Sequence, residues 1–142
     1  MPFHQLNRAI AIAAEAHAGQ TDKAGQPYIL HPLRVMGAMG AEDARIVAVL
    51  HDVIEDCPEW PLDRLRAEGY AGEHLEALDA LTRREGESYT SYVHRASLNS
   101  LARSVKLADL RDNMDLNRFT PETDDDWARY QKYARAVAYL LP

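Results

Sequence analysis

The sequence has 142 residues and a formal net charge of −6, with 46% hydrophobic and 27% charged residues. That length fits one domain that buries roughly two thirds of its unfolded surface, and no apolar run approaches the roughly 20 residues that span a bilayer. The acidic balance argues against a nucleic-acid-binding protein, which usually has a basic face. The N-terminus lacks the pattern of a signal peptide, so we expect a single-domain cytoplasmic protein without nucleic-acid or membrane partners. The one cysteine, Cys57, agrees with a reducing compartment.

The first half of the chain shows the period of amphipathic helices, interrupted by one turn-rich loop. Apolar side chains follow one helical stripe until Gly19 breaks it, and Pro32 suits the first turn of a helix, where a proline loses no hydrogen bond. The next helical segment is apolar on most sides, with His51 and Asp52 in its last turn. The elements predicted here are a helix over 4–18, a loop over 19–28, a helix from Pro32 to about Met39 and a helix over 42–54.

The second half continues with helical segments separated by breaking residues. Two prolines interrupt the chain in 56–61, and Gly69 and Gly72 separate two short amphipathic segments. The elements predicted here are helices over 62–68 and 73–81, a charged turn over 82–88, a helical face of Tyr89, Tyr92, Val93 and Ala96, a helix from Leu101 to about Leu116, and one short helix from near Pro121 to Leu141. No segment alternates apolar and polar residues as a strand would, so we expect an all-α protein.

Four polar residues stand out because each follows an apolar run, alone or as a pair. They occur in three segments, PYILHPLRV with His31, VAVLHDVIED with His51 and Asp52, and VKLADLRDNM with Asp109. Such positions suggest buried ligands. Imidazole and carboxylate groups together suit Mn²⁺, Fe²⁺, Co²⁺ or Zn²⁺ better than metals that prefer thiolate. The four residues therefore predict one divalent metal site.

The spacing of these residues requires separate segments to meet in the folded core. Neighbouring residues such as His51 and Asp52 differ by about 100° around a helix, so both reach one metal only at a helix end or a crowded crossing. The alternative is that each has a structural role, with His31 at a helix start and the other two as a polar pair at a helix end. An acidic chain can still hold an anionic substrate at a metal site, because a divalent ion can reverse the local field.

Glu55 and Asp56 lie one turn beyond the His-Asp pair, in the pattern HDxxED. Glu55 is four residues from His51 and therefore on the same helical face. A divalent ion lowers the pKa of a water molecule to about 7 in favourable sites, and a nearby carboxylate can orient that water or carry its proton. The alternative is that both acidic residues are simply solvated before Pro58.

Taken together, these segments resemble the HD-domain metal-dependent phosphohydrolases, and among them the hydrolase domain of the RelA/SpoT proteins and their small stand-alone homologues. The stretch AHAGQTDKAGQPYILHPLRV is similar to the first block of that family, VLHDVIED to its HD block, and VKLADLRDNM to a third block that usually reads close to VKLADRLHNM. Three blocks in the same order are far more specific than a single His-Asp dipeptide.

The resemblance implies an HD-domain helical bundle over residues 1–142 that binds one divalent metal, commonly Mn²⁺. It implies that the metal ligands are His31, His51, Asp52 and Asp109. It also implies that Glu55 and Asp56 are the catalytic carboxylates. The family reaction is attack of water on phosphorus, which removes the 3′-diphosphate of guanosine tetra- or pentaphosphate and releases pyrophosphate. The implied partner is thus a small phosphorylated nucleotide.

Residues on the expected substrate side include both matches to the family pattern and departures from it. Lys23, Tyr28 and Asn113 are the residues expected to contact the nucleotide, although a loop lysine is often only solvated and Tyr28 also fits the core. Asp22 stands where the hydrolases usually carry an arginine. Asp112 stands at the usual histidine of the third block.

Two further departures follow the third block, where Asp115 and Leu116 replace a basic residue and a threonine. Together with Asp22, they keep two other hypotheses open. The first is an HD hydrolase of another phosphorylated nucleotide or of a cofactor phosphate. The second is a catalytically silent HD module that binds a nucleotide.

The remaining histidines and one acidic cluster favour structural roles. His17 lies on the apolar stripe of the first helix, which indicates a hydrogen-bonded core histidine. His4, His74 and His94 have no acidic or histidine partner in their local pattern and indicate surface positions. The acidic residues within 123–127 suit a helix start, where the helix dipole favours negative charge.

Overall fold

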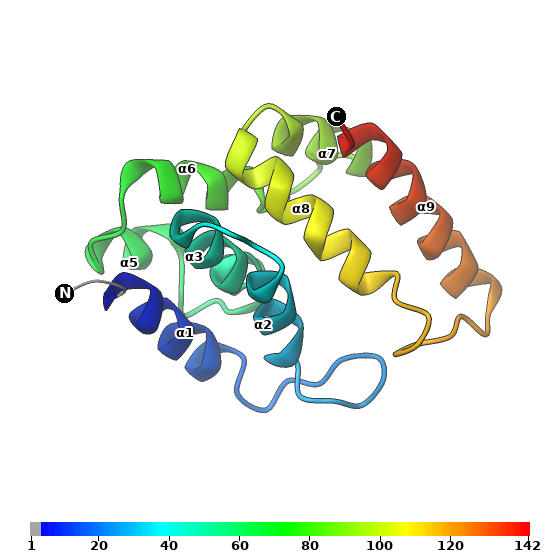
Figure 1. Cartoon of the computed structure of the whole chain (residues 1–142), viewed down its shortest axis with the longest axis horizontal. Coiled ribbons are helices and arrows are strands. Elements are labelled where there is room, and N and C mark those ends of the chain that lie inside the picture. The colour runs from blue at the N-terminus through cyan, green and yellow to red at the C-terminus, as the bar shows by residue number, and fades with distance from the viewer. Residues whose placement is uncertain (1–3) are drawn as a thin grey trace.

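The computed structural model describes residues 4–142, and every regular element in that range is a helix (Figure 1). In chain order the described helices are α1 (His4–Ala16), α2 (Leu30–Gly37), α3 (Glu42–Leu50), α4 (Val53–Asp56), α5 (Leu62–Ala67), α6 (Gly72–Ala80), α7 (Tyr89–Ser97), α8 (Ser100–Asn113) and α9 (Asp124–Leu140). The β structure of the described residues is limited to an isolated bridge between Thr21 and Pro27. The expected all-α fold is confirmed.

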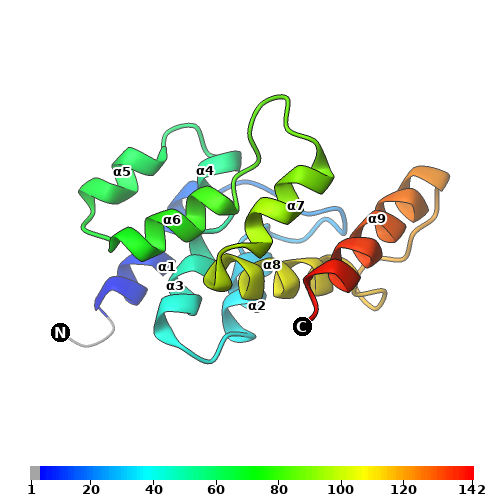
Figure 2. The same ribbon diagram turned by 90° about the horizontal axis from the view of Figure 1, so that it is seen from above.

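The helices form a bundle with α3 and α8 at its centre. Helix α3 packs against α1, α2, α6 and α8, and α8 packs against α2, α3, α6, α7 and α9. Figure 2 shows α4 to α7 as a layer above α1, α2, α3 and α8, while Figure 1 shows α8 and α9 side by side. His51 follows the end of α3 and Asp109 lies on α8. The centre of the bundle therefore supplies two of the predicted ligands.

The buried apolar side chains form a large and a small cluster. The large cluster is built around α3, whose residues 46–50 are each at most 1% exposed. The small cluster joins α7, α8 and α9 and consists of Tyr92, Val93, Leu110, Ala136 and Leu140. Full burial of one large aliphatic side chain contributes about 1.5–3 kcal/mol. The large cluster therefore anchors α3 much more firmly than the small cluster anchors α9.

The helix predicted over 42–54 is interrupted, because the backbone turns at His51. Helix α3 ends at Leu50, and α4 begins only at Val53. The Nδ1 atom of His51 donates a hydrogen bond to the carbonyl oxygen of Ala48, which a continuing helix would pair with the fourth residue onward. The prediction of one continuous helix was wrong because apolar residues continue on both sides of the turn.

The last helix lies within the range predicted for it, from near Pro121 to Leu141, and has a reciprocal N-terminal cap. Helix α9 has 17 residues; the Thr123 side chain accepts a hydrogen bond from the Asp126 N–H, and the Asp126 carboxylate accepts one from the Thr123 N–H. The acidic residues of its first turn thus stabilise the helix start, as predicted. Among the described helices, α9 included, none combines the length and apolarity needed to cross a membrane.

Candidate metal centre

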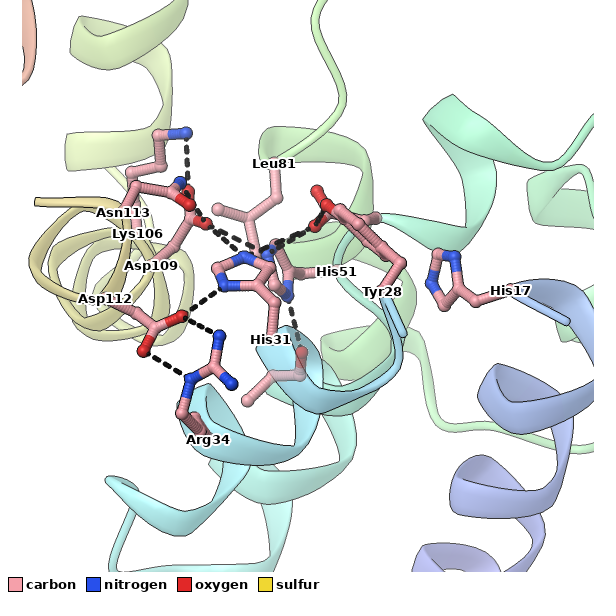
Figure 3. A network of polar contacts seen from close by, with 12 residues as sticks. His17, Tyr28, His31, Arg34, His51, Leu81, Lys106, Asp109, Asp112 and Asn113 are labelled. Carbon is pink, nitrogen blue, oxygen red and sulfur yellow. Dashed lines mark hydrogen bonds and ion pairs between the residues drawn. The ribbon is translucent and has the colours of Figure 1, made fainter. Parts of the chain in front are cut away.

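The four predicted ligands meet at one point inside the bundle, and Figure 3 labels three of them, His31, His51 and Asp109. His31 comes from the first turn of α2, His51 and Asp52 from the turn between α3 and α4, and Asp109 from α8. One possible ligand atom from each residue lies within 4.8 Å of those of the other three. Asp52 is half-buried and the other three are buried. The structure therefore brings together all four residues from three segments far apart in the sequence.

The turn between α3 and α4 lets two adjacent residues face the same point. His51 Nε2 lies 3.0 Å from Asp52 Oδ2, although neighbours in a regular helix point about 100° apart. The same Nε2 atom lies 3.2 Å from Asp109 Oδ1. The interruption of the predicted helix is thus what makes a His-Asp pair usable as a pair of ligands.

Both imidazoles present Nε2 to the centre because each Nδ1 is engaged elsewhere. His51 Nδ1 lies 2.5 Å from the carbonyl oxygen of Ala48, and a carbonyl can only accept, so Nδ1 carries the proton. His31 Nδ1 lies 2.6 Å from Asp112 Oδ2 and donates to that carboxylate (Figure 3). In a neutral ring each Nε2 then keeps its lone pair, which is the form that binds metal.

The donor set fits a divalent metal ion. Asp109 Oδ1 lies 2.9 Å from His31 Nε2 and 3.2 Å from His51 Nε2, so acceptor atoms of neutral imidazoles and carboxylates face one another. Such an arrangement is repulsive unless positive charge lies among the atoms. Two imidazole nitrogens and two carboxylates suit Mn²⁺, Fe²⁺, Co²⁺ or Zn²⁺. The cluster can therefore hold one such ion.

The electrostatics of the centre favour positive charge. Burial by itself would lower the pKa of His51, but the carboxylates of Asp52 and Asp109 outweigh it and raise that pKa well above its ordinary value. Burial would raise the pKa of Asp109, yet the Lys106 ammonium and the His51 imidazole hold it well below its ordinary range. The carboxylates thus attract either protons onto the imidazoles or a metal cation.

Two contacts on α8 fix the orientation of the Asp109 carboxylate. The Lys106 ammonium lies 2.9 Å from Asp109 Oδ2, and the Asn113 side chain donates to Oδ1 at 3.2 Å. Lys106 is only 9% exposed and lies 5.0 Å from the centre of the Tyr92 ring. Sequence reasoning missed Lys106, although a spacing of three residues from Asp109 places it on the same face of a helix.

Glu55 and Asp56 lie on α4, directly after the ligand-bearing turn, and their side chains remain accessible. Neither carboxylate forms an ion pair with another described residue. Partial burial and the negative charge of Asp52 raise the pKa of both groups. Their raised pKa values suit groups that exchange protons.

A cavity of about 360 Å³ lies beside the centre, between the loop 19–28, the end of α8 and α9. Lys23, Tyr28 and Asn113, the three predicted nucleotide contacts, all line it. Tyr28 donates a hydrogen bond to Asp52 Oδ2 at 2.6 Å, and Asn113 contacts Asp109. Two residues of the cavity wall therefore bond directly to carboxylates of the metal centre. The volume lies in the usual range of small-molecule sites.

Two of the departures from the family pattern, Asp22 and Leu116, line this cavity. Asp22 Oδ1 accepts hydrogen bonds from the backbone N–H groups of Ala24 and Gln26, both at 2.9 Å, and so closes the loop. Its Oδ2 lies 3.8 Å from Arg118 Nη1, and Arg118 and Leu116 both line the cavity. The segment after α8 therefore supplies an arginine opposite the loop position where the family carries one.

The structure confirms the position predicted for His17 and corrects the one predicted for His74. His17 is 2% exposed and its Nδ1 lies 2.8 Å from Gln20 Oε1, which confirms the predicted core histidine. The surface position predicted for His74 was wrong, because His74 is 3% exposed and its Nε2 lies 2.6 Å from Asp43 Oδ1. That partner is 31 residues away and so is absent from the local pattern.

Comparison with known proteins places the chain beside enzymes of guanosine polyphosphate metabolism. No family model matches the chain. It is 33% identical over 131 residues to a GTP pyrophosphokinase of Streptomyces coelicolor, 32% over 123 residues to the bifunctional (p)ppGpp synthase/hydrolase SpoT of Escherichia coli, and 32% over 147 residues to a probable guanosine-3′,5′-bis(diphosphate) 3′-pyrophosphohydrolase of Synechocystis.

These similarities cover most of this chain but a small part of each relative. They span 82%, 78% and 92% of the chain, and 15%, 18% and 19% of the respective relatives. The chain therefore spans less than a fifth of the length of the curated relatives it matches.

Proposed function

Starting from the homology of this chain to one segment of SpoT- and RelA-type proteins, we propose that it is a divalent-metal-dependent phosphohydrolase. The proposed reaction is removal of the 3′-diphosphate from guanosine 3′,5′-bis(diphosphate). The proposal includes one HD domain over residues 1–142, Mn²⁺ as the metal, and a cytoplasmic location, where nucleotides are available and Cys57 stays reduced.

The observation that carries the proposal is that the cavity and the metal centre share a wall. Tyr28 and Asn113 line the cavity and contact Asp52 and Asp109, respectively. A nucleotide in the cavity would therefore place a phosphate group next to the four proposed ligands. Lys23 adds positive charge to this wall. Its pKa is lowered mainly by partial burial and, to a smaller extent, by repulsion from Arg129. Two neighbouring cations of this kind attract a polyphosphate.

The chemistry divides between the ion and two carboxylates. An ion held by His31, His51, Asp52 and Asp109 would supply an acidified water and polarise a phosphoryl oxygen. Glu55 and Asp56 would orient the attacking water and take its proton. Attack on phosphorus breaks its bond to the ribose 3′ oxygen, which takes up a proton as pyrophosphate and guanosine 5′-diphosphate are released.

A second candidate function keeps the hydrolysis and changes the substrate. Asp22 and Leu116 line the cavity, where the resembling family carries an arginine and a threonine. A cavity wall with one acidic and one apolar replacement favours a substrate with a different nucleobase, or the phosphate of a cofactor. The silent nucleotide-binding module is less favoured, because binding alone would not require Glu55 and Asp56 beside the centre.

One experiment separates the three possibilities. The purified chain is incubated with Mn²⁺ and guanosine 3′,5′-bis(diphosphate), and with a panel of other nucleotide 2′- and 3′-phosphates, and the products are resolved by anion exchange. Pyrophosphate from the guanosine compound supports the main proposal, and faster hydrolysis of another panel member supports the second. Tight binding with every nucleotide recovered unchanged supports the silent module. Asp52→Ala serves as the metal-site control.

A further inference from the structure

Asp112 has an unusual set of contacts one helical turn beyond Asp109 on α8. Its Oδ2 accepts from His31 Nδ1 at 2.6 Å and from Arg34 Nη2 at 3.1 Å, and its Oδ1 accepts from Arg34 Nε at 2.8 Å (Figure 3). Arg118 Nη2 approaches the same Oδ2 at 3.1 Å. The side chain therefore uses both oxygens to join three basic residues.

The bond between Asp112 and His31 is well shielded from water. The side chain of His31 is 5% exposed and that of Asp112 is 11% exposed. A short, shielded bond to a carboxylate is charge-assisted and stronger than a neutral hydrogen bond. A carboxylate on the distal nitrogen of a metal-binding histidine fixes the tautomer and the ring orientation, and it raises the basicity of the ligating nitrogen.

Two arginines, Arg34 and Arg118, also bind the Asp112 carboxylate. Arg34 follows His31 by three residues on α2, so one helix supplies both the imidazole and a guanidinium for the same carboxylate. Arg118 comes from the segment after α8, lines the cavity and also faces Asp22. The contacts thus run from the metal centre through Asp112 and Arg118 to Asp22 in the loop 19–28.

We propose that Asp112 is a positioning residue of the metal centre, which holds His31 in the Nδ1–H tautomer with Nε2 directed at the ion. Arg34 and Arg118 keep Asp112 in place. This inference rests on the proposed metal-dependent function and concerns a residue that departs from the resembling family, whose third block has histidine at this position. Asp112 contacts a ligand and touches neither substrate nor ion, so its effect acts through His31.

The first test measures Mn²⁺ affinity by calorimetric titration of the folded protein and its variants. We expect Asp112→Ala to weaken Mn²⁺ binding about 10–100-fold, the usual cost of losing an outer partner of a ligand. Asp112→Asn should lose less, because its amide oxygen still accepts from His31 Nδ1. Asp43→Asn is the control: it alters an aspartate–histidine contact away from the centre, between the exposed Asp43 and the buried His74, and should leave Mn²⁺ affinity unchanged.

A second readout follows the hydrogen bond itself without any metal. In ¹⁵N-labelled protein, the proton on His31 Nδ1 should appear as a downfield, slowly exchanging resonance, because its bond is short and shielded. That resonance should disappear in Asp112→Ala and persist, shifted, in Asp112→Asn, while circular dichroism monitors the fold. It should also be lost in His31→Asn, which assigns it.

The outcomes separate this inference from the proposed function. If Asp112→Ala binds Mn²⁺ as tightly as the unsubstituted chain while Asp52→Ala does not bind it, the positioning role is overturned and the metal centre stands. A His31 Nδ1 proton resonance that is unchanged in Asp112→Ala would also overturn the positioning role. If the unsubstituted chain binds no divalent metal, the proposed function and this inference fall together.

Discussion

The metal centre and the cavity beside it are built from different kinds of structure. The proposed ligands of the centre come from α2, the turn after α3 and α8, and further contacts orient His31, His51 and Asp109. The cavity is lined by a loop, the end of α8 with the segment after it, and α9, and several of its charged side chains are partly exposed. The side chains of the centre are held by contacts from several helices, whereas the loop 19–28 of the cavity wall is held mainly by hydrogen bonds within the loop.

On the proposed function, this difference assigns the chemistry to the centre and the choice of substrate to the cavity wall. A change at the centre alters buried charges that depend on one another, so its effect on metal binding and stability should be large. A change in the cavity wall alters residues whose contacts reach water, so its effect should be confined to the substrate. The following predictions test that division, beginning with the largest expected effect.

Removal of one proposed ligand should abolish the function of the centre. In Asp52→Ala we expect Mn²⁺ affinity to fall by more than the roughly 10–100-fold typical of outer contacts, and hydrolysis should be lost with it. Calorimetric titration and a pyrophosphate assay measure the two effects. Hydrolysis at the original rate in this variant would exclude the site.

Lys106 should show how strongly the centre depends on its buried supports. Lys106→Met leaves the Asp109 carboxylate without its ammonium partner at 2.9 Å, and breaking a buried pair costs about 3–5 kcal/mol. Urea unfolding measures the loss. Arg66→Met is the control, because the Arg66–Asp63 pair is highly exposed and such pairs contribute about 0–1 kcal/mol. Equal losses in both variants would contradict the distinction.

The cavity wall should affect substrate binding without affecting the metal. We expect Lys23→Ala to raise KM about tenfold, equivalent to about 1.4 kcal/mol, while Mn²⁺ affinity stays unchanged. Steady-state kinetics and titration of the same preparation check both parts. Arg135→Ala removes a cation of α9 that does not line this cavity, so its KM should match that of the unsubstituted chain. A fall in Mn²⁺ affinity in the Lys23 variant would show that the two regions are not separable.

The smallest effect concerns an ion pair outside both regions. Hydrogen bonds from Arg95 and the backbone of Arg84 lower the pKa of Glu87 from 4.5 to about 2. Because the folded pKa is depressed, this stabilisation is present above pH 4.5 and is lost as the pH falls toward about 2. Glu87→Gln should flatten the pH dependence of stability in that window, measured by thermal unfolding. Its Mn²⁺ affinity at neutral pH should be unchanged, which separates acid sensitivity from metal loss.

The sequence predicts features that depend on short-range pattern. The candidate metal ligands were recognisable because His31, the His51–Asp52 pair and Asp109 each follow an apolar run, and the helices because they are amphipathic. The interruption at His51 was missed, since its cause is a side-chain bond that competes with the helix.

Features that depend on distant partners were harder to foresee. Arg34 and His31 contact Asp112 across about 80 residues of sequence, and no local pattern marks such a pair. The same holds for His74 and its partner Asp43. Lys106 is different, because its spacing from Asp109 was visible and only its burial was not.

The small apolar cluster under α9 has a consequence for how the protein can change over evolutionary time. Helix α9 lines the cavity through Asp126, Arg129, Tyr130 and Tyr133, yet the cluster buries only two of its residues. Replacements on this helix therefore disturb few packed neighbours and leave the ligand-bearing segments intact. On the proposed function, substitutions on α9 can therefore change the substrate preference while the four proposed metal ligands stay in place.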